Sequence, residues 1–275
     1  MPLRRLVVRA VPASARGAVC WLAMASVTAP LAAPTTVYVQ LPAGTLNSVL
    51  AGDADTGPLT IAPFAMRTTP VTIGEFRRFV RAHPQWRRDR VASTFADAGY
   101  LQAWRTADAP GDAGGEAQPV TQVSWFAAQA YCEAEGGRLP TWSEWEYAAA
   151  ADATRRDARA DPAWRARILG WYSRPASDPL PKVGGKPNVY GVRDLHGVVW
   201  EWVDDFASLL VEGDSRTGDD PDKLKFCGAG AINLKGRENY AVLMRIALLS
   251  SLDAADGTGS LGFRCARSSQ HQEQP

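Results

Sequence analysis

The feature of this sequence that most constrains its fold is a series of short helices with marked starts, separated by long stretches without periodic patterning. Thr72 and Glu75 have the T-x-x-E spacing of a capping box, in which each side chain bonds to the other's backbone. Apolar residues at helical spacing then line one face, and a proline ends the pattern: Phe76, Phe79, Val80 and Pro84. This pattern predicts an amphipathic first helix.

Three more helices are predicted downstream. Ser124 can cap a second helix that ends at Gly136-Gly137, and Thr141 with Glu144 forms another capping box at the start of a third. A fourth helix is predicted over residues 162–169. The positions expected to face inward are Trp125, Ala128 and Cys132 in the second helix and Trp142, Trp145 and Ala149 in the third.

The remaining chain has the composition of loops and short strands. Residues 107–118 and 213–222 are rich in polar and turn-forming residues, which predicts surface excursions, and residues 268–275 are predicted to be a disordered tail. The 275 residues are 46% hydrophobic and show no linker-like shift in composition, which favours one core. Composition alone therefore predicts an α+β domain with much irregular structure.

Residues 1–33 have the pattern of a cleavable secretory signal. Four arginines without any acidic residue precede a mostly apolar stretch over residues 18–31, and small residues follow. The stretch is interrupted and shorter than the ~20 apolar residues of a membrane span, so an uncleaved anchor is the less favoured alternative. We therefore predict a periplasmic or secreted protein with no membrane contact after cleavage. Arg4-Arg5 leaves open whether export uses the general or the twin-arginine route.

The charge of the exported chain excludes nucleic acid as a partner. Removing the 4 arginines of the signal from the 30 basic residues leaves 26, against 29 acidic residues. A chain that binds nucleic acid through its phosphates needs a basic surface, which this balance does not supply.

Ten tryptophans invite the hypothesis of a ligand-binding aromatic surface. Five follow helical or alternating spacing, which favours core packing: Trp125, Trp142, Trp145, Trp200 and Trp202. Four lie outside these patterns, and any one of them could line a groove: Trp86, Trp104, Trp164 and Trp171.

Four blocks in a fixed order carry a resemblance to a known family. They are residues 70–80 (PVTIGEFRRFV), 119–147 (including SWFAAQAYC and GRLPTWSEWEY), 188–202 (NVYGVRDLHGVVWEW) and 262–266 (GFRCA). Together they resemble the formylglycine-generating enzyme, or sulfatase-modifying factor, family. The resemblance implies an elaborated C-type-lectin-like fold over residues 59–267, preceded by a lead-in over residues 34–58.

The resemblance also implies a disulfide between Cys132 and Cys265, the cysteines of AYC and GFRC. Such a bridge agrees with an oxidising compartment. Cys227 is then left over as a free thiol.

The family's reactive cysteine pair is missing. In this family, formylglycine formation resembles a copper-dependent oxidation in which two cysteine thiolates hold Cu(I). The resemblance places these two cysteines at Gly236 and Ala241 of this chain. Neither side chain offers a ligand atom to this soft ion, so copper at the family site and formylglycine formation are predicted to be absent. An iron site is also disfavoured, because the chain has only three histidines.

A calcium site of the family maps onto the third block. The resemblance implies backbone carbonyls and one carboxylate as ligands, from Asp194, Gly197, Val199 and Glu201. Oxygen ligands at a glycine turn suit calcium. The alternative is a turn into a buried strand in which Glu201 forms a salt bridge.

Four strings resemble a subgroup, the NirV-type proteins encoded beside copper nitrite reductases: residues 171–175 (WYSRP), 195–206 (LHGVVWEWVDDF), 226–228 (FCG) and 243–245 (LMR). The resemblance implies an exported accessory protein of denitrification that helps a periplasmic copper nitrite reductase to mature. The alternative function is a metal-dependent oxidase that modifies a protein or peptide through a different metal arrangement. Authentic formylglycine formation is the least supported.

Overall fold

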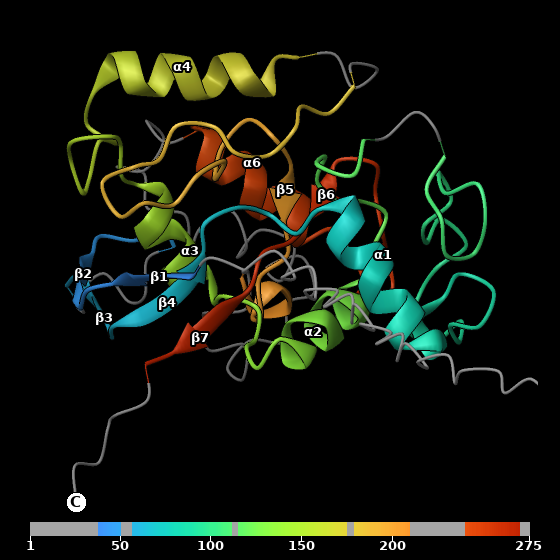
Figure 1. The fold of residues 1–275 in the computed structure, drawn as a ribbon. Coiled ribbons are helices and arrows are strands. Elements are labelled where there is room, and N and C mark those ends of the chain that lie inside the picture. The colour runs from blue at the N-terminus through green and yellow to red at the C-terminus, as the bar shows by residue number, and fades with distance from the viewer. Residues whose placement is uncertain (1–37, 51–56, 112–114, 175–178, 210–239, 270–275) are drawn as a thin grey trace, which may run out of the picture. The chain divides into compact units, whose positions relative to one another are not determined.

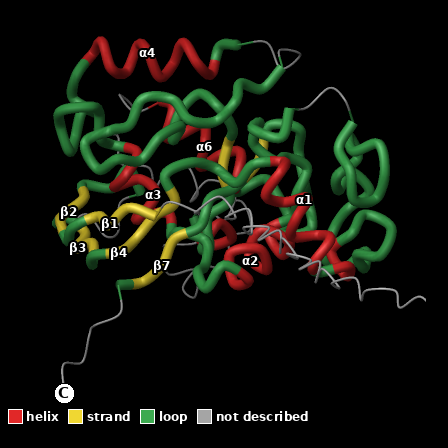
Figure 2. Tube along the Cα trace, in the orientation of Figure 1, coloured by secondary structure: helices red, strands yellow, loops and turns green. Residues whose placement is uncertain are grey.

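The computed structural model describes residues 38–50, 57–111, 115–174, 179–209 and 240–269, all of which belong to one compact unit. The helices are α1 (Ile73–Ala82), α2 (Trp125–Ala134), α3 (Trp142–Ala149), α4 (Pro162–Tyr172) and α6 (Tyr240–Leu249), with short 3-10 turns at Pro84–Trp86 and Phe206–Ser208. Long loops connect them (Figure 2). The predicted α+β class with much irregular structure is confirmed.

Short strands bring distant parts of the chain together. In the largest sheet, β4 (Phe64–Arg67) lies between β1 (Tyr38–Leu41) and β7 (Ala266–Ser268), and both pairs are antiparallel. A hairpin joins β2 (Gly44–Leu46) to β3 (Leu59–Ile61), and β5 (Trp200–Glu201) runs parallel to β6 (Leu261–Gly262). The predicted lead-in therefore contributes strand β1 to the main sheet, which Figure 1 shows in blue beside β4.

The predicted helix starts are confirmed. Thr72–Glu75 and Thr141–Glu144 form both hydrogen bonds of a capping box, and the Ser124 side chain accepts from the Ala127 N–H. The expected inward residues of α1 and α3 are buried. In α2, Ala128 and Cys132 are buried but Trp125 is only half-buried.

Two predicted boundaries are wrong. Helix α4 continues to Tyr172, beyond the predicted end at residue 169, because Trp171 and Tyr172 pack their rings against His196 and Trp200. Strand β7 includes Ser268, the first residue of the predicted tail, because Ser268 pairs with Phe64. The predicted signal and the excursion over residues 213–222 lie outside the described residues.

Buried ion pairs connect the elements around the apolar core. Arg67 at the end of β4 is only 3% exposed and contacts Glu75 of α1 at 2.6 Å and Glu135, just after α2, at 2.5 Å. Glu146 of α3 accepts from Ser48, the Val49 N–H, Trp142 and Arg159. Burial raises the pKa of Glu146, and these four donors act against the effect of burial without reversing it. The Arg67 cluster therefore ties α1 and the end of α2 to β4, and the Glu146 cluster ties α3 to the segment after β2.

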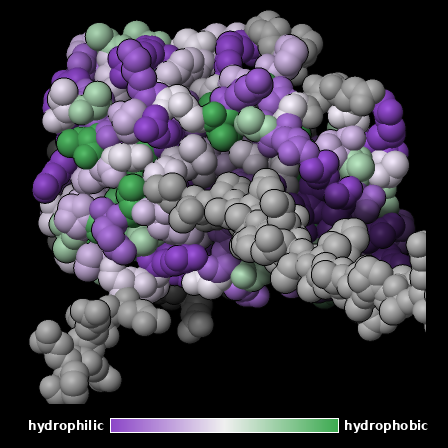
Figure 3. Space-filling view, in the orientation of Figure 1, coloured by the Kyte–Doolittle hydropathy of each residue, from purple (hydrophilic) through white to green (hydrophobic). Residues whose placement is uncertain are grey.

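The face of the molecule drawn in Figure 3 is largely hydrophilic, with strongly hydrophobic residues as separate spots. Among the described residues, no helix is long and apolar enough to cross a membrane.

Candidate functional site

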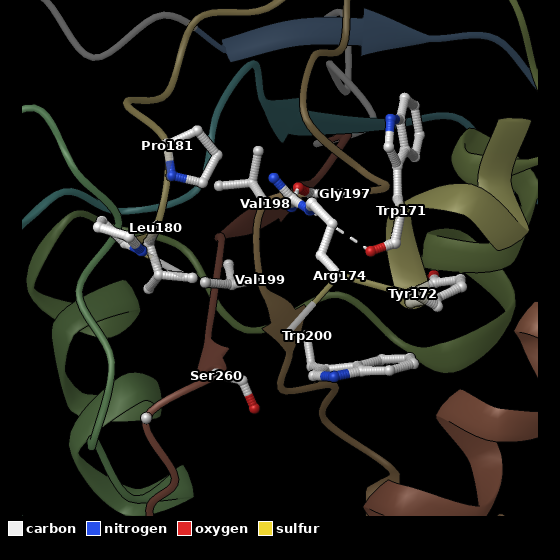
Figure 4. Close-up of a pocket in the computed structure, with 12 residues that line it drawn as sticks. Trp171, Tyr172, Arg174, Leu180, Pro181, Gly197, Val198, Val199, Trp200 and Ser260 are labelled. Atoms are coloured by element: carbon white, nitrogen blue, oxygen red, sulfur yellow. Dashed lines mark hydrogen bonds between the residues drawn. The ribbon is translucent and has the colours of Figure 1, made fainter. Parts of the chain in front are cut away.

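A cleft of about 430 Å³ lies at the C-terminal end of α4, and we call it the aromatic cleft. Four segments meet there: the end of α4, residues 179–181, the segment that leads into β5, and the residues before β6. It is lined by Trp171, Tyr172, Arg174, residues 179–181, residues 197–200, Gly259 and Ser260. Part of the predicted calcium motif therefore forms a wall of this cleft (Figure 4).

Stacked rings form one side of the aromatic cleft. The rings of Tyr172 and Trp200 lie 4.5 Å apart and almost parallel, at 10°. Trp171 lies flat against Gly197, whose φ of +87° is the left-handed region that favours glycine. A Cβ at Gly197 would lie 2.5 Å from the Trp171 ring, so only glycine allows this approach.

Arg174 brings a positive charge into the aromatic cleft. Its guanidinium donates to the Gly197 carbonyl, and its Nε donates to the Trp171 carbonyl at 3.4 Å. Figure 4 shows the side chain between the aromatic residues of α4 and the aliphatic side chains of Val198 and Val199. Within the described part of the chain, no carboxylate forms a salt bridge with Arg174. The cleft thus combines apolar walls with one cation that has donors to spare.

His196 lies behind the aromatic wall. Its ring contacts the indoles of Trp145, Trp164 and Trp171, and its Nε2 lies 2.9 Å from the Ala149 carbonyl. A carbonyl only accepts, so Nε2 carries the proton and Nδ1 accepts from the Tyr172 hydroxyl at 3.3 Å. Burial lowers the pKa of His196 to about 4. The neutral imidazole therefore holds the end of α4 in place.

A layer of buried charge supports the cleft from below. Glu201 and Arg264 are both fully buried, and the Arg264 guanidinium donates to both Glu201 oxygens at 2.8 Å. The Trp145 indole donates to the same carboxylate at 2.8 Å. Arg245 of α6 lies 3.6 Å above the Trp145 ring and donates to the Glu201 backbone carbonyl, and burial lowers its pKa to about 10.

The predicted calcium ligands are already engaged. Asp194 accepts from the N–H groups of Gly184 and Gly185, the Gly197 carbonyl accepts from Arg174, and Glu201 is held by Arg264 and Trp145. Val199 is buried.

A calcium ion here would have to displace two guanidinium groups, so in this arrangement these residues do not fit the ion. Among the residues that the structure describes, no cluster of three or more His, Cys, Asp or Glu side chains is placed to hold a metal. The calcium site that the resemblance implies at Asp194, Gly197, Val199 and Glu201 and the contacts of these residues here therefore lead to opposite expectations for chelation.

The cysteine predictions have separate outcomes. Cys132 and Cys265 form a disulfide with Cα atoms 5.4 Å apart, which ties α2 to the start of β7. Ala241, the second lost thiol position, is buried in a cluster with Ala158, Trp164 and Ile168. Gly236 and Cys227 lie outside the described residues.

The tryptophans divide differently from the prediction. Of the predicted groove candidates, Trp164 is buried, Trp171 lines the aromatic cleft, and Trp104 is buried but lines a second cavity of about 190 Å³. Trp200, predicted to pack in the core, is half-buried: it packs against the core and also lines the same cleft. Strand β5 has only two residues, so the alternation of apolar and polar residues is too short to predict which face Trp200 lies on.

Comparison with known proteins agrees with this architecture. The family model of the sulfatase-modifying factor enzyme 1-like domain matches residues 25–269, so the chain belongs to that family. The chain is 37% identical over 167 residues to a formylglycine-generating enzyme of Streptomyces coelicolor, which covers 54% of this chain and 52% of the relative. The matched part thus spans about half of that enzyme.

Two further relatives are named for different activities, one as an inactive enzyme and the other as an oxygenase. Inactive C-alpha-formylglycine-generating enzyme 2 of Mus musculus is 29% identical over 254 residues, covering 79% of each chain. Hercynine oxygenase of Mycolicibacterium smegmatis is 34% identical over 164 residues, covering 52% of this chain and 37% of that enzyme. Among solved structures, PvdO from Pseudomonas aeruginosa matches with a TM-score of 0.43 and 21% identity over 84% of this chain and 94% of that chain.

Proposed function

We propose that this chain is an exported, non-catalytic member of the family that helps a partner protein to mature, and that the partner is a periplasmic copper nitrite reductase of denitrification. The observation that carries the proposal is Ala241. Its methyl group offers no ligand to Cu(I), which prefers thiolates, and it is packed against α4. A substrate cysteine would therefore meet neither a thiolate nor an open surface at this position.

Two further observations support a binding role in an oxidising compartment. The similarity to an inactive relative extends over most of both chains, whereas the similarity to the active Streptomyces enzyme covers about half of each. The disulfide between Cys132 and Cys265 and the signal pattern of residues 1–33 both support export. The four strings shared with the NirV-type subgroup are what point to nitrite reductase.

Deletion of the gene in a strain that encodes a copper nitrite reductase tests the partner. The proposal predicts a lower copper content per reductase polypeptide with an unchanged reductase transcript, and restoration by the wild-type chain. Matched measurements on another periplasmic copper protein control for a general loss of copper. An unchanged copper content in the deletion strain would remove nitrite reductase as the partner.

The second candidate is a metal-dependent oxidase with a different metal arrangement. The observation that favours it is the similarity to hercynine oxygenase. Metal analysis of protein purified from the periplasm separates the two functions: a stoichiometric redox metal favours the oxidase, and its absence favours the accessory protein.

A further inference from the structure

The geometry of the aromatic cleft points to a ligand of one chemical class, an aromatic or branched aliphatic group that carries a single carboxylate. The cleft lies within the region that the family model matches, and none of the proteins compared above assigns a ligand to it. This inference concerns the cleft alone, so it holds or fails whether or not the chain serves a nitrite reductase.

The charge of the cleft selects the carboxylate. Arg174 is the one charged side chain among the described residues that line it. A guanidinium has five N–H donors in a planar fork. The carbonyls of Gly197 and Trp171 use only some of them. Arg174 is itself an exposed residue at the edge of the cleft. A single carboxylate neutralises its charge and matches its fork, whereas a phosphate dianion would keep one negative charge without a cationic partner among the described residues that line the cleft.

The walls select the apolar part of the ligand. Tyr172 and Trp200 present stacked rings on one side, and Leu180, Pro181 and Val198 present aliphatic groups on another. A site of about 430 Å³ has the size of a small-molecule pocket, which is usually apolar with a few fixed polar groups. A flat or branched side chain can contact the rings while its carboxylate reaches Arg174.

The cation is held in place before any ligand arrives. The Gly197 turn brings its carbonyl to the Arg174 guanidinium, and the same turn supports the Trp171 ring. His196 fixes the Tyr172 hydroxyl from behind. Groups held in this way lose little freedom on binding, which favours affinity.

Calorimetric titration of the purified mature chain with N-acetylphenylalanine tests the inference. N-acetylphenylalaninamide, which has the same ring without the charge, and N-acetylglycine, which has the charge without the ring, are the matched controls. We expect the acid to bind at least about tenfold more tightly than either control, because a charge-assisted hydrogen bond and an aromatic contact are each lost.

Variants connect the binding to the cleft. Arg174→Gln should lower the affinity for N-acetylphenylalanine by about tenfold or more. Arg78→Gln, at an exposed position on α1, should leave this affinity unchanged. Arg174→Lys keeps the charge and should retain part of the affinity. Near-ultraviolet circular dichroism and melting curves of each variant establish that the fold is intact.

Three results would each overturn the inference: equal affinity for the acid and its amide, unchanged affinity in a folded Arg174→Gln variant, or no binding at millimolar acid. If the acid binds as expected, a peptide that ends in phenylalanine, with a free or an amidated C-terminus, identifies the source. Tighter binding of the free-terminus peptide than of the single residue assigns the cleft to polypeptide C-termini, and equal binding assigns it to small acids.

Discussion

One residue, Glu201, connects β5 to α3, to α6 and to the segment between β6 and β7. Its side chain accepts from Arg264 and Trp145, and its backbone carbonyl accepts from Arg245. Removing one partner of a fully buried pair leaves the other charge without compensation, which usually costs about 3–5 kcal/mol. Glu201→Ala should therefore lower the free energy of unfolding by about this amount in urea denaturation.

An exposed pair provides the control for this prediction. Arg87 and Asp89 form a similar two-bond contact at the surface, and Asp89→Ala should leave the stability unchanged within error. If Glu201→Ala unfolds at the same urea concentration as the wild type, the buried pair does not stabilise the fold.

Chelation tests whether the individual residues Glu201 and Gly197 bind calcium. Because Arg264 and Arg174 occupy the oxygens of Glu201 and Gly197, the structure predicts that EDTA leaves the melting temperature of the wild type unchanged. A lower melting temperature that added calcium restores, and that Glu201→Ala abolishes, would instead establish the family's calcium site.

His196 makes stability depend on pH. Its folded-state pKa of about 4 lies below the ordinary value of 6.5, so between these values the unfolded chain binds the proton and the folded chain does not. The contribution is fully present above about pH 6.5 and is lost as the pH falls toward 4, with a total of roughly 3 kcal/mol.

Urea denaturation of the wild type and of His196→Asn across this range measures the effect. We expect a steeper acid-side loss of stability in the wild type than in the variant. Identical slopes would show that the imidazole titrates normally in the folded protein.

At the scale of elements, the packing of α4 on α6 has the largest functional consequence. Ala241 of α6 contacts a cluster that includes Trp164 and Ile168 of α4 (Figure 1). The sequence alone predicts that the family's second thiol is absent, because residue 241 is alanine. The sequence does not predict that α4 covers Ala241, because α4 and α6 are far apart in the sequence and no local pattern encodes their packing.

The disulfide is the strongest connection between elements, because it joins α2 to β7 across 133 residues of sequence. Closing a loop of this length stabilises a fold by about 4–5 kcal/mol, chiefly by restricting the unfolded chain. We expect the Cys132→Ala/Cys265→Ala variant to lose a comparable amount in urea denaturation. Cys227→Ser, outside the bridge, is the matched thiol control. Equal stability of the double variant and the wild type would contradict the assignment.

At the scale of the whole molecule, local signals were the predictable part. Capping boxes define α1 and α3 because their bonds lie within four residues, and four ordered blocks were enough to indicate the family. The aromatic cleft was not predictable, because it joins Tyr172, Trp200 and Ser260 from three separate segments. The tryptophan content was the one sequence feature that indicated a groove. It correctly indicated Trp171 as a lining residue but assigned Trp200 to the core.

We expect the family's thiol chemistry to be absent from this chain, and one assay tests this expectation directly. The purified chain, supplied with Cu(I) and oxygen, is incubated with a CxPxR sulfatase peptide, and the products are analysed by mass spectrometry beside an active formylglycine-generating enzyme. With glycine and alanine at positions 236 and 241, we expect the peptide cysteine to remain unchanged in every sample of this chain. Conversion to the aldehyde by the wild type, and its loss in Cys227→Ser, would contradict the account.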